Sequence, residues 1–162
     1  GLGIIGTGGI GAELARMAAA LGMDVVAWTR SGVPAALPVG ALELDELLAT
    51  SDIVSLHLTL NDGTRGFLDA ARLARFKPGA IFVNTARGAI VDEAALIEGL
   101  RGGELRHAAL DVFVEEPLPA GHPLTSLPNV TLTSHAGFMT REASIRLLAI
   151  ALDLVEEERA RL

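Results

Sequence analysis

The chain has 162 residues, half of them hydrophobic, and its 20 acidic and 13 basic residues give a formal net charge of −7 at pH 7. A chain of this length buries about 70% of the surface that its unfolded form exposes, so we expect one domain around one core. The net negative charge argues against a nucleic acid or an anionic membrane as partner, so we expect a small-molecule ligand. The absence of cysteine excludes disulfides and thiolate chemistry. No secretory signal and no apolar run long enough for a membrane helix is visible, which predicts a cytoplasmic protein.

The first half of the chain alternates between strand and helix patterns. Residues 2–6 form a short apolar run, and residues 10–22 have the apolar spacing of a helix that ends at Gly22, a suitable helix C-cap. The next predicted elements are a strand at residues 23–28, a short helix at 41–50, a strand at 51–58 and a helix at 68–76 that is closed by Pro78.

The second half continues the same alternation. It contains predicted strands at residues 79–85, 105–113 and 129–134, a helix at 91–103 and a long terminal helix from about Thr140. The only long irregular stretch is residues 114–129, and a loop of that length in a compact domain is more often functional than idle.

The pattern as a whole predicts an α/β fold with a doubly wound parallel sheet. Its strands are apolar throughout and alternate with helices, which is typical of a sheet that is covered on both faces. We expect a Rossmann-type dinucleotide-binding domain that takes up residues 1–162. Because the chain starts almost on the first glycine turn, it looks like a domain excised from a two-domain protein, and we expect the isolated domain to bind dinucleotide without turnover.

The first glycine turn carries a dinucleotide-binding pattern. "GTGGIG" follows a predicted strand and opens a predicted helix, which is the context that this fingerprint requires. In a dinucleotide-binding turn, Gly6 permits the tight turn, Gly8 lets the backbone approach a pyrophosphate, and Gly11 lets the helix pack closely on the strand. The alternative interpretation of the motif is an ordinary glycine-rich turn. The expected cofactor contacts in this turn are Gly6, Gly8, Gly9, Ile10 and Gly11.

Three polar side chains follow three other strands. Arg87, Glu116 and His135 each lie beyond the carboxyl end of a different predicted strand, so they are expected to converge at one edge of the sheet. Taken singly, each has a simpler interpretation as a surface arginine, a solvated loop charge or a structural histidine. Three further histidines have no partner motif in the sequence and are expected to be structural or exposed: His57, His107 and His122.

These motifs together resemble the coenzyme-binding domain of the D-isomer-specific 2-hydroxyacid dehydrogenases, closest to the glyoxylate and hydroxypyruvate reductases. The resemblance runs over nearly all of the chain and includes "LGIIGTGGIGAELARMAAALGM", "KPGAIFVNTARGAIVDEAAL", "AALDVFVEEPLP" and "HPLTSLPNVTLTSHAGF". It implies an NAD(P)-dependent oxidoreductase acting on a small 2-keto or D-2-hydroxy acid, and a homodimer. The alternative is a dinucleotide-sensing module, because co-repressors that resemble this family keep the same fold.

The resemblance also implies roles for individual residues. Arg87 would bind the substrate carboxylate and keto oxygen, His135 would be the general acid and base, and Glu116 would hydrogen-bond His135 and stabilise its protonated form. Asp111 would hold the nicotinamide carboxamide, and Thr85 is a further expected cofactor contact. No metal site is expected.

Two positions depart from the family pattern. Gly9 stands where many members carry a basic or larger side chain, so backbone amides must hold the pyrophosphate there. Thr59 replaces the usual Pro beside the adenine site.

The end of the second predicted strand bears on the choice of cofactor. In folds that use NAD, an acidic residue near this point binds the ribose 2′-hydroxyl and repels a 2′-phosphate. Here the sequence reads "WTRS", so Thr29, Arg30 and Ser31 replace the acid with one guanidinium and two hydroxyls. This stretch predicts NADP as the cofactor, with NAD as the alternative.

Overall fold

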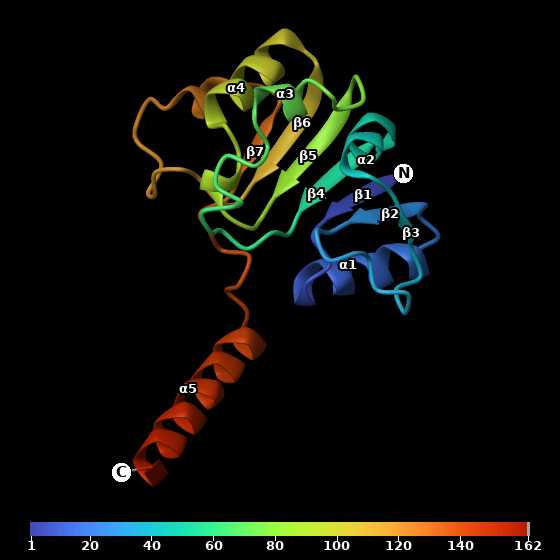
Figure 1. Cartoon of the computed structure of the whole chain (residues 1–162). Coiled ribbons are helices and arrows are strands. Elements are labelled where there is room, and N and C mark those ends of the chain that lie inside the picture. The colour runs from blue at the N-terminus through green and yellow to red at the C-terminus, as the bar shows by residue number, and fades with distance from the viewer. Residues whose placement is uncertain (162) are drawn as a thin grey trace.

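The computed structural model describes residues 1–161, and its centre is a seven-stranded sheet in which every pair of neighbouring strands is parallel (Figure 1). The strands stand in the order β3-β2-β1-β4-β5-β6-β7. The order reverses between β1 and β4, which creates a switch point where ligands bind in open sheets. The strand bounds are β1 (Leu2–Ile5), β2 (Val25–Trp28), β3 (Gly40–Ala41), β4 (Ile53–Leu56), β5 (Ala80–Asn84), β6 (Leu105–Leu110) and β7 (Val130–Leu132).

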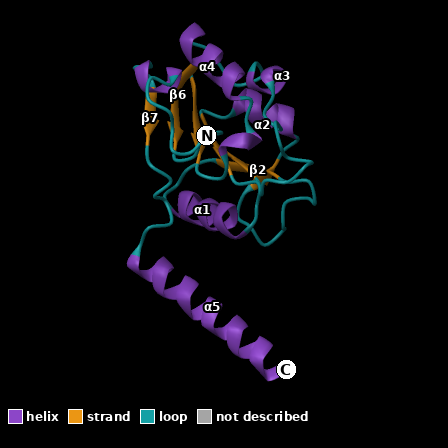
Figure 2. Ribbon diagram, turned by 90° about the vertical axis from the view of Figure 1, so that its left-hand side faces the viewer, coloured by secondary structure: helices purple, strands orange, loops and turns teal. Residues whose placement is uncertain are grey.

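Helices cover both faces of this sheet, as the doubly wound prediction requires. Helix α1 lies on one side of the sheet, and α2, α3 and α4 lie on the other (Figure 2). The helix bounds are α1 (Gly9–Ala20), α2 (Leu44–Thr50), α3 (Ala70–Leu73), α4 (Glu93–Gly102) and α5 (Arg141–Arg161), with 3-10 turns η1 (Gly88–Ile90) and η2 (Pro123–Ser126). The predicted α/β fold class is therefore confirmed.

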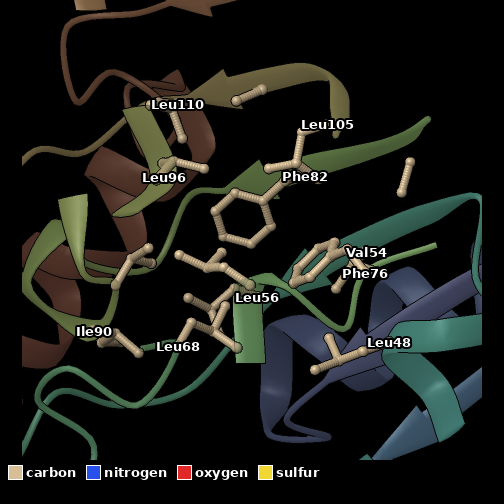
Figure 3. Close-up of a cluster of buried hydrophobic side chains, with 14 of the residues drawn as sticks. Leu48, Val54, Leu56, Leu68, Phe76, Phe82, Ile90, Leu96, Leu105 and Leu110 are labelled. Atoms are coloured by element: carbon tan, nitrogen blue, oxygen red, sulfur yellow. The ribbon is translucent and has the colours of Figure 1, made fainter. Parts of the chain in front are cut away.

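Two groups of buried apolar side chains correspond to the two faces. The larger group joins the sheet to α2, α3 and α4, and Figure 3 shows Phe82 of β5 among leucines from neighbouring elements. The ring of Phe76 meets Phe82 edge to face with centroids 5.7 Å apart. The smaller group joins β1 and β2 to Ala15 and Ala18 of α1. All four residues of β1 are buried, whereas burial alternates along β5, because the α1 layer does not extend that far across the sheet.

Several predicted elements are longer than those in the structure. The strands predicted at 51–58 and 129–134 are confined to Ile53–Leu56 and Val130–Leu132. The helix predicted at residues 68–76 is confined to Ala70–Leu73, because the amides of Arg75 and Phe76 bond carbonyls three residues back. The strand predicted at 105–113 ends at Leu110. The short strand β3 was not predicted, and the helix predicted at 41–50 begins only at Leu44 as α2.

The terminal helix α5 projects away from the sheet, as Figure 1 shows, and none of its residues is buried. Its start at Arg141 agrees with the predicted start near Thr140. Within residues 1–161, no helix combines the length and apolar character needed to cross a membrane.

Candidate functional site

The glycines of the first turn have distinct structural reasons. Gly6 has a φ of +99°, a conformation that favours glycine, and a Cβ atom there would lie 2.6 Å from the His57 carbonyl oxygen. A Cβ atom on Gly11 would collide with the carbonyl oxygen of Gly6. By contrast, a Cβ atom on Gly8 or Gly9 would meet nothing within 4 Å. Gly6 and Gly11 therefore allow close packing, whereas Gly8 and Gly9 leave space open above the turn.

That open space belongs to a pocket suited to an anion. The pocket has a volume of about 440 Å³, and its lining includes Gly8, Gly9, Ile10, Thr85 and Arg87. Within residues 1–161 the amides at residues 9–11, at the start of α1, donate no hydrogen bond, and the first intrahelical bond runs from the Ala12 amide to the Gly8 carbonyl. Free amides and the positive end of the helix dipole attract negative charge. The turn therefore fits the diphosphate of a dinucleotide.

A second pocket lies beyond the end of β2. It has a volume of about 510 Å³, and Leu58 and Thr59 line both this pocket and the first one. The Trp28 ring stacks on Phe67 with centroids 5.4 Å apart and gives the pocket an aromatic wall. The loop that follows Thr59 is held by Thr64, whose hydroxyl donates to the Thr59 carbonyl at 2.6 Å. The second pocket therefore has a defined shape without a proline at residue 59.

The three residues that bear on the choice of cofactor line this second pocket together: Thr29, Arg30 and Ser31. The exposed Arg30 side chain reaches across to the loop, where Nη2 donates to the Gly63 carbonyl at 3.4 Å. A bond of that length to one carbonyl leaves most of the guanidinium donors available to a ligand.

The third pocket contains a carboxylate and imidazole pair. The Glu116 Oε2 and His135 Nδ1 atoms are 2.7 Å apart, and each side chain is 35% exposed. The pocket has a volume of about 540 Å³ and is lined in part by both residues. Glu116 is also held by the Phe113 amide, which donates to Oε1 at 2.9 Å. The hydrogen bond to His135, followed by the one from Phe113, lowers the pKa of the Glu116 carboxyl, so this group stays ionised and orients the imidazole.

Arg87 lines the pocket of the glycine turn. It caps the 3-10 turn η1, and the Asn84 side chain donates to its carbonyl oxygen at 3.1 Å. The exposed guanidinium donates to the Ala86 carbonyl, and its charge is close enough to be one of the causes that lower the pKa of Glu116. The structure therefore brings Arg87, Glu116 and His135 to the same edge of the sheet.

Asp111 is buried, and it anchors the turn that carries His135. Its carboxylate accepts hydrogen bonds from the Thr133 hydroxyl and from the amides of Ala136 and Gly137, both at 2.9 Å. Burial acts to raise the pKa of Asp111, but these three bonds outweigh it and the pKa is lowered. His135 has a φ of 53°, a conformation that non-glycine residues rarely adopt. Asp111 therefore holds a strained turn in place from the end of β6.

A family model for the D-isomer specific 2-hydroxyacid dehydrogenase NAD-binding domain matches residues 1–137. The chain belongs to this family. Within it, a glyoxylate reductase from Aeropyrum pernix is 44% identical over 155 residues, which cover 94% of this chain and 46% of the relative. The chain spans about half the length of that relative.

Two solved structures of D-isomer specific 2-hydroxyacid dehydrogenases are similar to this chain. One, from Xanthobacter autotrophicus Py2 in complex with NADPH and MES, is 46% identical with a TM-score of 0.78, and the match covers 83% of this chain and 44% of the other. The second, an NAD-complexed form from Lactobacillus delbrueckii ssp. bulgaricus, is 31% identical with a TM-score of 0.87, and the match covers 94% and 50% of the two chains. A nicotinamide dinucleotide is therefore the cofactor class of this family, without a choice between NAD and NADP.

Sequence reasoning missed the partners of three histidines in this family member. The His57 ring is bonded to Ser55, the His107 ring to Thr131, and the His122 ring to Glu93, with separations of 2.8, 2.9 and 3.2 Å. Only Ser55 and His57 are close in sequence. Residues two apart on an extended strand face the same side of the sheet, so their side chains can meet. This pairing could therefore have been predicted from the sequence.

Proposed function

We propose that this chain is the coenzyme-binding part of a reductase that transfers a hydride between a nicotinamide dinucleotide and a small 2-keto or D-2-hydroxy acid. The proposal rests on one observation, the 2.7 Å contact between Glu116 and His135 at the sheet edge that also carries the glycine turn and Arg87. A sensor module needs no such acid and base pair. The names of the relatives, which are oxidoreductases, support the same choice.

Each residue of the site has a chemical role in this proposal. Arg87 offers a planar, permanently charged fork that binds a carboxylate through two parallel hydrogen bonds. Because His135 uses Nδ1 to bond Glu116, its Nε2 atom is the one that gives a proton to the substrate carbonyl oxygen. Glu116 fixes the orientation of the His135 ring through this hydrogen bond. When bound, the nicotinamide supplies the hydride.

We further propose glyoxylate or hydroxypyruvate as the type of substrate. The named activity of the Aeropyrum pernix relative, a glyoxylate reductase, supports this choice. We also propose that the protein is cytoplasmic and forms a homodimer. Light scattering on the protein in solution would test the dimer. The substrate itself is tested by measuring nicotinamide oxidation by the enzyme that contains this chain, over a panel of 2-keto acids with each reduced cofactor.

The role of His135 is tested in the same assay. Replacement of His135 by Ala should lower kcat by about 10²- to 10⁴-fold, the usual range for a lost general acid or base, while cofactor affinity stays nearly unchanged. His107→Ala is the matched control, since that imidazole also bonds a single side chain but lines none of the three pockets at this edge. Unchanged kcat in the His135 variant would contradict the proposal.

NADP is the proposed cofactor. The support is the set of Thr29, Arg30 and Ser31 around one pocket, with a guanidinium and two hydroxyls where NAD-using folds place an acid. A charge-assisted, partly exposed phosphate contact is worth about 1.5–3 kcal/mol, or some ten- to hundredfold in affinity. The wild type should therefore have the higher kcat/KM with NADPH, and Thr29→Asp combined with Arg30→Ala should reverse the preference. A wild type that prefers NADH would refute this assignment.

A further inference from the structure

His57 directly follows β4 at the switch point, and it lies against the glycine turn. Its backbone amide donates to the Ile5 carbonyl at 2.7 Å, which continues the pairing of β1 with β4 beyond Leu56. Its carbonyl oxygen is the atom that a side chain on Gly6 would strike, and its Cβ atom would lie 3.2 Å from a Cβ atom on Gly11. The first and third fingerprint glycines therefore pack against this one residue.

The His57 ring is held in a fixed orientation by Ser55. Its Nε2 atom lies 2.8 Å from the Ser55 hydroxyl, and Ser55 is only 4% exposed. Within residues 1–161 the ring is the only hydrogen-bond partner of that hydroxyl. A buried hydroxyl whose proton has no acceptor costs free energy, so the arrangement in which Ser55 donates to Nε2 is favoured. The ring proton then resides on Nδ1. Burial lowers the pKa of His57, which keeps the ring neutral at neutral pH.

The second ring nitrogen, Nδ1, is available to the pocket of the glycine turn. His57 lines that pocket together with Gly8, Gly9 and Ile10. Within the described part of the chain, Nδ1 makes no hydrogen bond, and the only fully buried side-chain polar atom without a partner is the Ser51 hydroxyl oxygen, so Nδ1 is accessible to solvent. The two glycines bring no side-chain donor of their own.

We propose that His57 is a dinucleotide-binding residue whose Nδ1–H donates a hydrogen bond to a diphosphate oxygen of the cofactor, with Ser55 as the positioning residue that selects this tautomer. The inference rests on the proposed function, because it places the dinucleotide in this pocket. The glycine turn lacks a basic side chain at Gly9, and His57 supplies a side-chain donor to the anion from the end of β4 instead. A neutral donor also avoids placing a second fixed charge beside Arg87.

Nuclear magnetic resonance of the histidine ring nitrogens tests the tautomer without any cofactor. In the wild type at neutral pH, His57 should be neutral with its proton on Nδ1, and Ser55→Ala should raise the fraction protonated on Nε2. A wild-type ring protonated on Nε2 would overturn the inference, because its Nδ1 atom could then only accept.

Binding titrations test the contact itself. We expect His57→Leu to weaken NADH or NADPH binding about tenfold, the usual effect of losing one hydrogen bond to a charged group, and to leave AMP binding unchanged because AMP lacks the diphosphate bridge. His57→Asn, which keeps an N–H donor near the Nδ1 site, should restore most of the affinity. His107→Leu is the matched control, because it removes a hydroxyl-bonded imidazole that does not line this pocket and should change neither titration.

The outcomes separate this inference from the proposed function. If the wild type binds neither NADH nor NADPH, the proposed function fails and the inference fails with it. If the wild type binds and His57→Leu binds equally well, or if AMP affinity falls as much as NADH affinity, only the role of His57 is overturned. Thermal melting of each variant shows whether the fold is intact, and the tautomer measurement on the wild type stands even if His57→Leu does not fold.

Discussion

Gly88 packs directly on the backbone of Phe113, so closely that a Cβ atom at Gly88 would collide with the Phe113 carbonyl group and the amide of Val114. Gly88 is the residue after Arg87, and Phe113 donates its amide to Glu116. This contact therefore sets the distance between the segment that carries the guanidinium and the segment that carries the carboxylate.

Gly88→Ala should destabilise the protein by about 1–3 kcal/mol, because the added methyl group forces two rigid backbone segments apart. Urea unfolding measures this change. The control is Gly99→Ala in α4, where the new methyl group would meet Glu104 and Leu105 only at 3.7 and 4.0 Å. That variant should be unchanged or more stable by about 0.5–1 kcal/mol, since alanine is favoured in a helix interior. Equal effects of the two substitutions would contradict the role assigned to the Gly88 contact.

Asp111→Asn should destabilise the protein by about 1–3 kcal/mol, because an amide cannot accept all three of the hydrogen bonds that reach the carboxylate from residues 133–137. The turn that holds His135 should become more mobile. Hydrogen exchange at the amides of Ala136 and Gly137 measures this directly. Unchanged protection of both amides in the variant would show that Asp111 does not anchor the turn.

Glu116→Gln should alter the dependence of stability on pH. The hydrogen bond to His135 lowers the pKa of Glu116 in the folded protein from its usual value of 4.5, so its stabilising contribution is complete above that pH and is lost as the pH falls through the folded-state pKa. The wild type should therefore lose stability on acidification below pH 4.5 more steeply than the variant does. Urea unfolding over an acidic pH series checks this. Glu115→Gln, the neighbouring carboxylate in the same loop, should follow the wild-type profile.

Arg87→Lys in the enzyme should lower kcat/KM for the keto acid by about ten- to a hundredfold, while cofactor affinity changes little. An ammonium is a point charge and cannot reproduce two parallel hydrogen bonds to a carboxylate. Steady-state kinetics with varied keto acid at saturating cofactor measures the effect. If both KM and kcat survive the replacement, Arg87 does not hold the substrate carboxylate.

Most of the fold could be predicted from local sequence, and the exceptions have physical causes. The alternation of apolar strands with helices predicted the parallel sheet, because burial on both faces leaves a mark in each segment separately. The two-residue strand β3 leaves no such mark, since its backbone is extended only through its pairing with β2. Helix α3 is shorter than its apolar spacing indicated because the amides of Arg75 and Phe76 bond carbonyls three residues back. The backbone amide of Lys77 then donates to the Leu48 carbonyl of α2, a partner distant in sequence.

The sequence by itself determined the class of fold, the glycine turn and the family, because each depends on residues close together in the chain or on a pattern that runs along it. Only the tertiary structure decided which side chains meet. Asp111 and Thr133 are 22 residues apart, Glu93 and His122 are 29 apart, and neither pairing is written in local spacing. The carboxyl ends of parallel strands lie at one edge of the sheet, but strand order and loop paths choose the neighbours there. For that reason the sequence predicted His135 and Arg87 as site residues. Only the tertiary structure shows that Asp111 anchors the His135 turn and that His57 packs against the glycine turn.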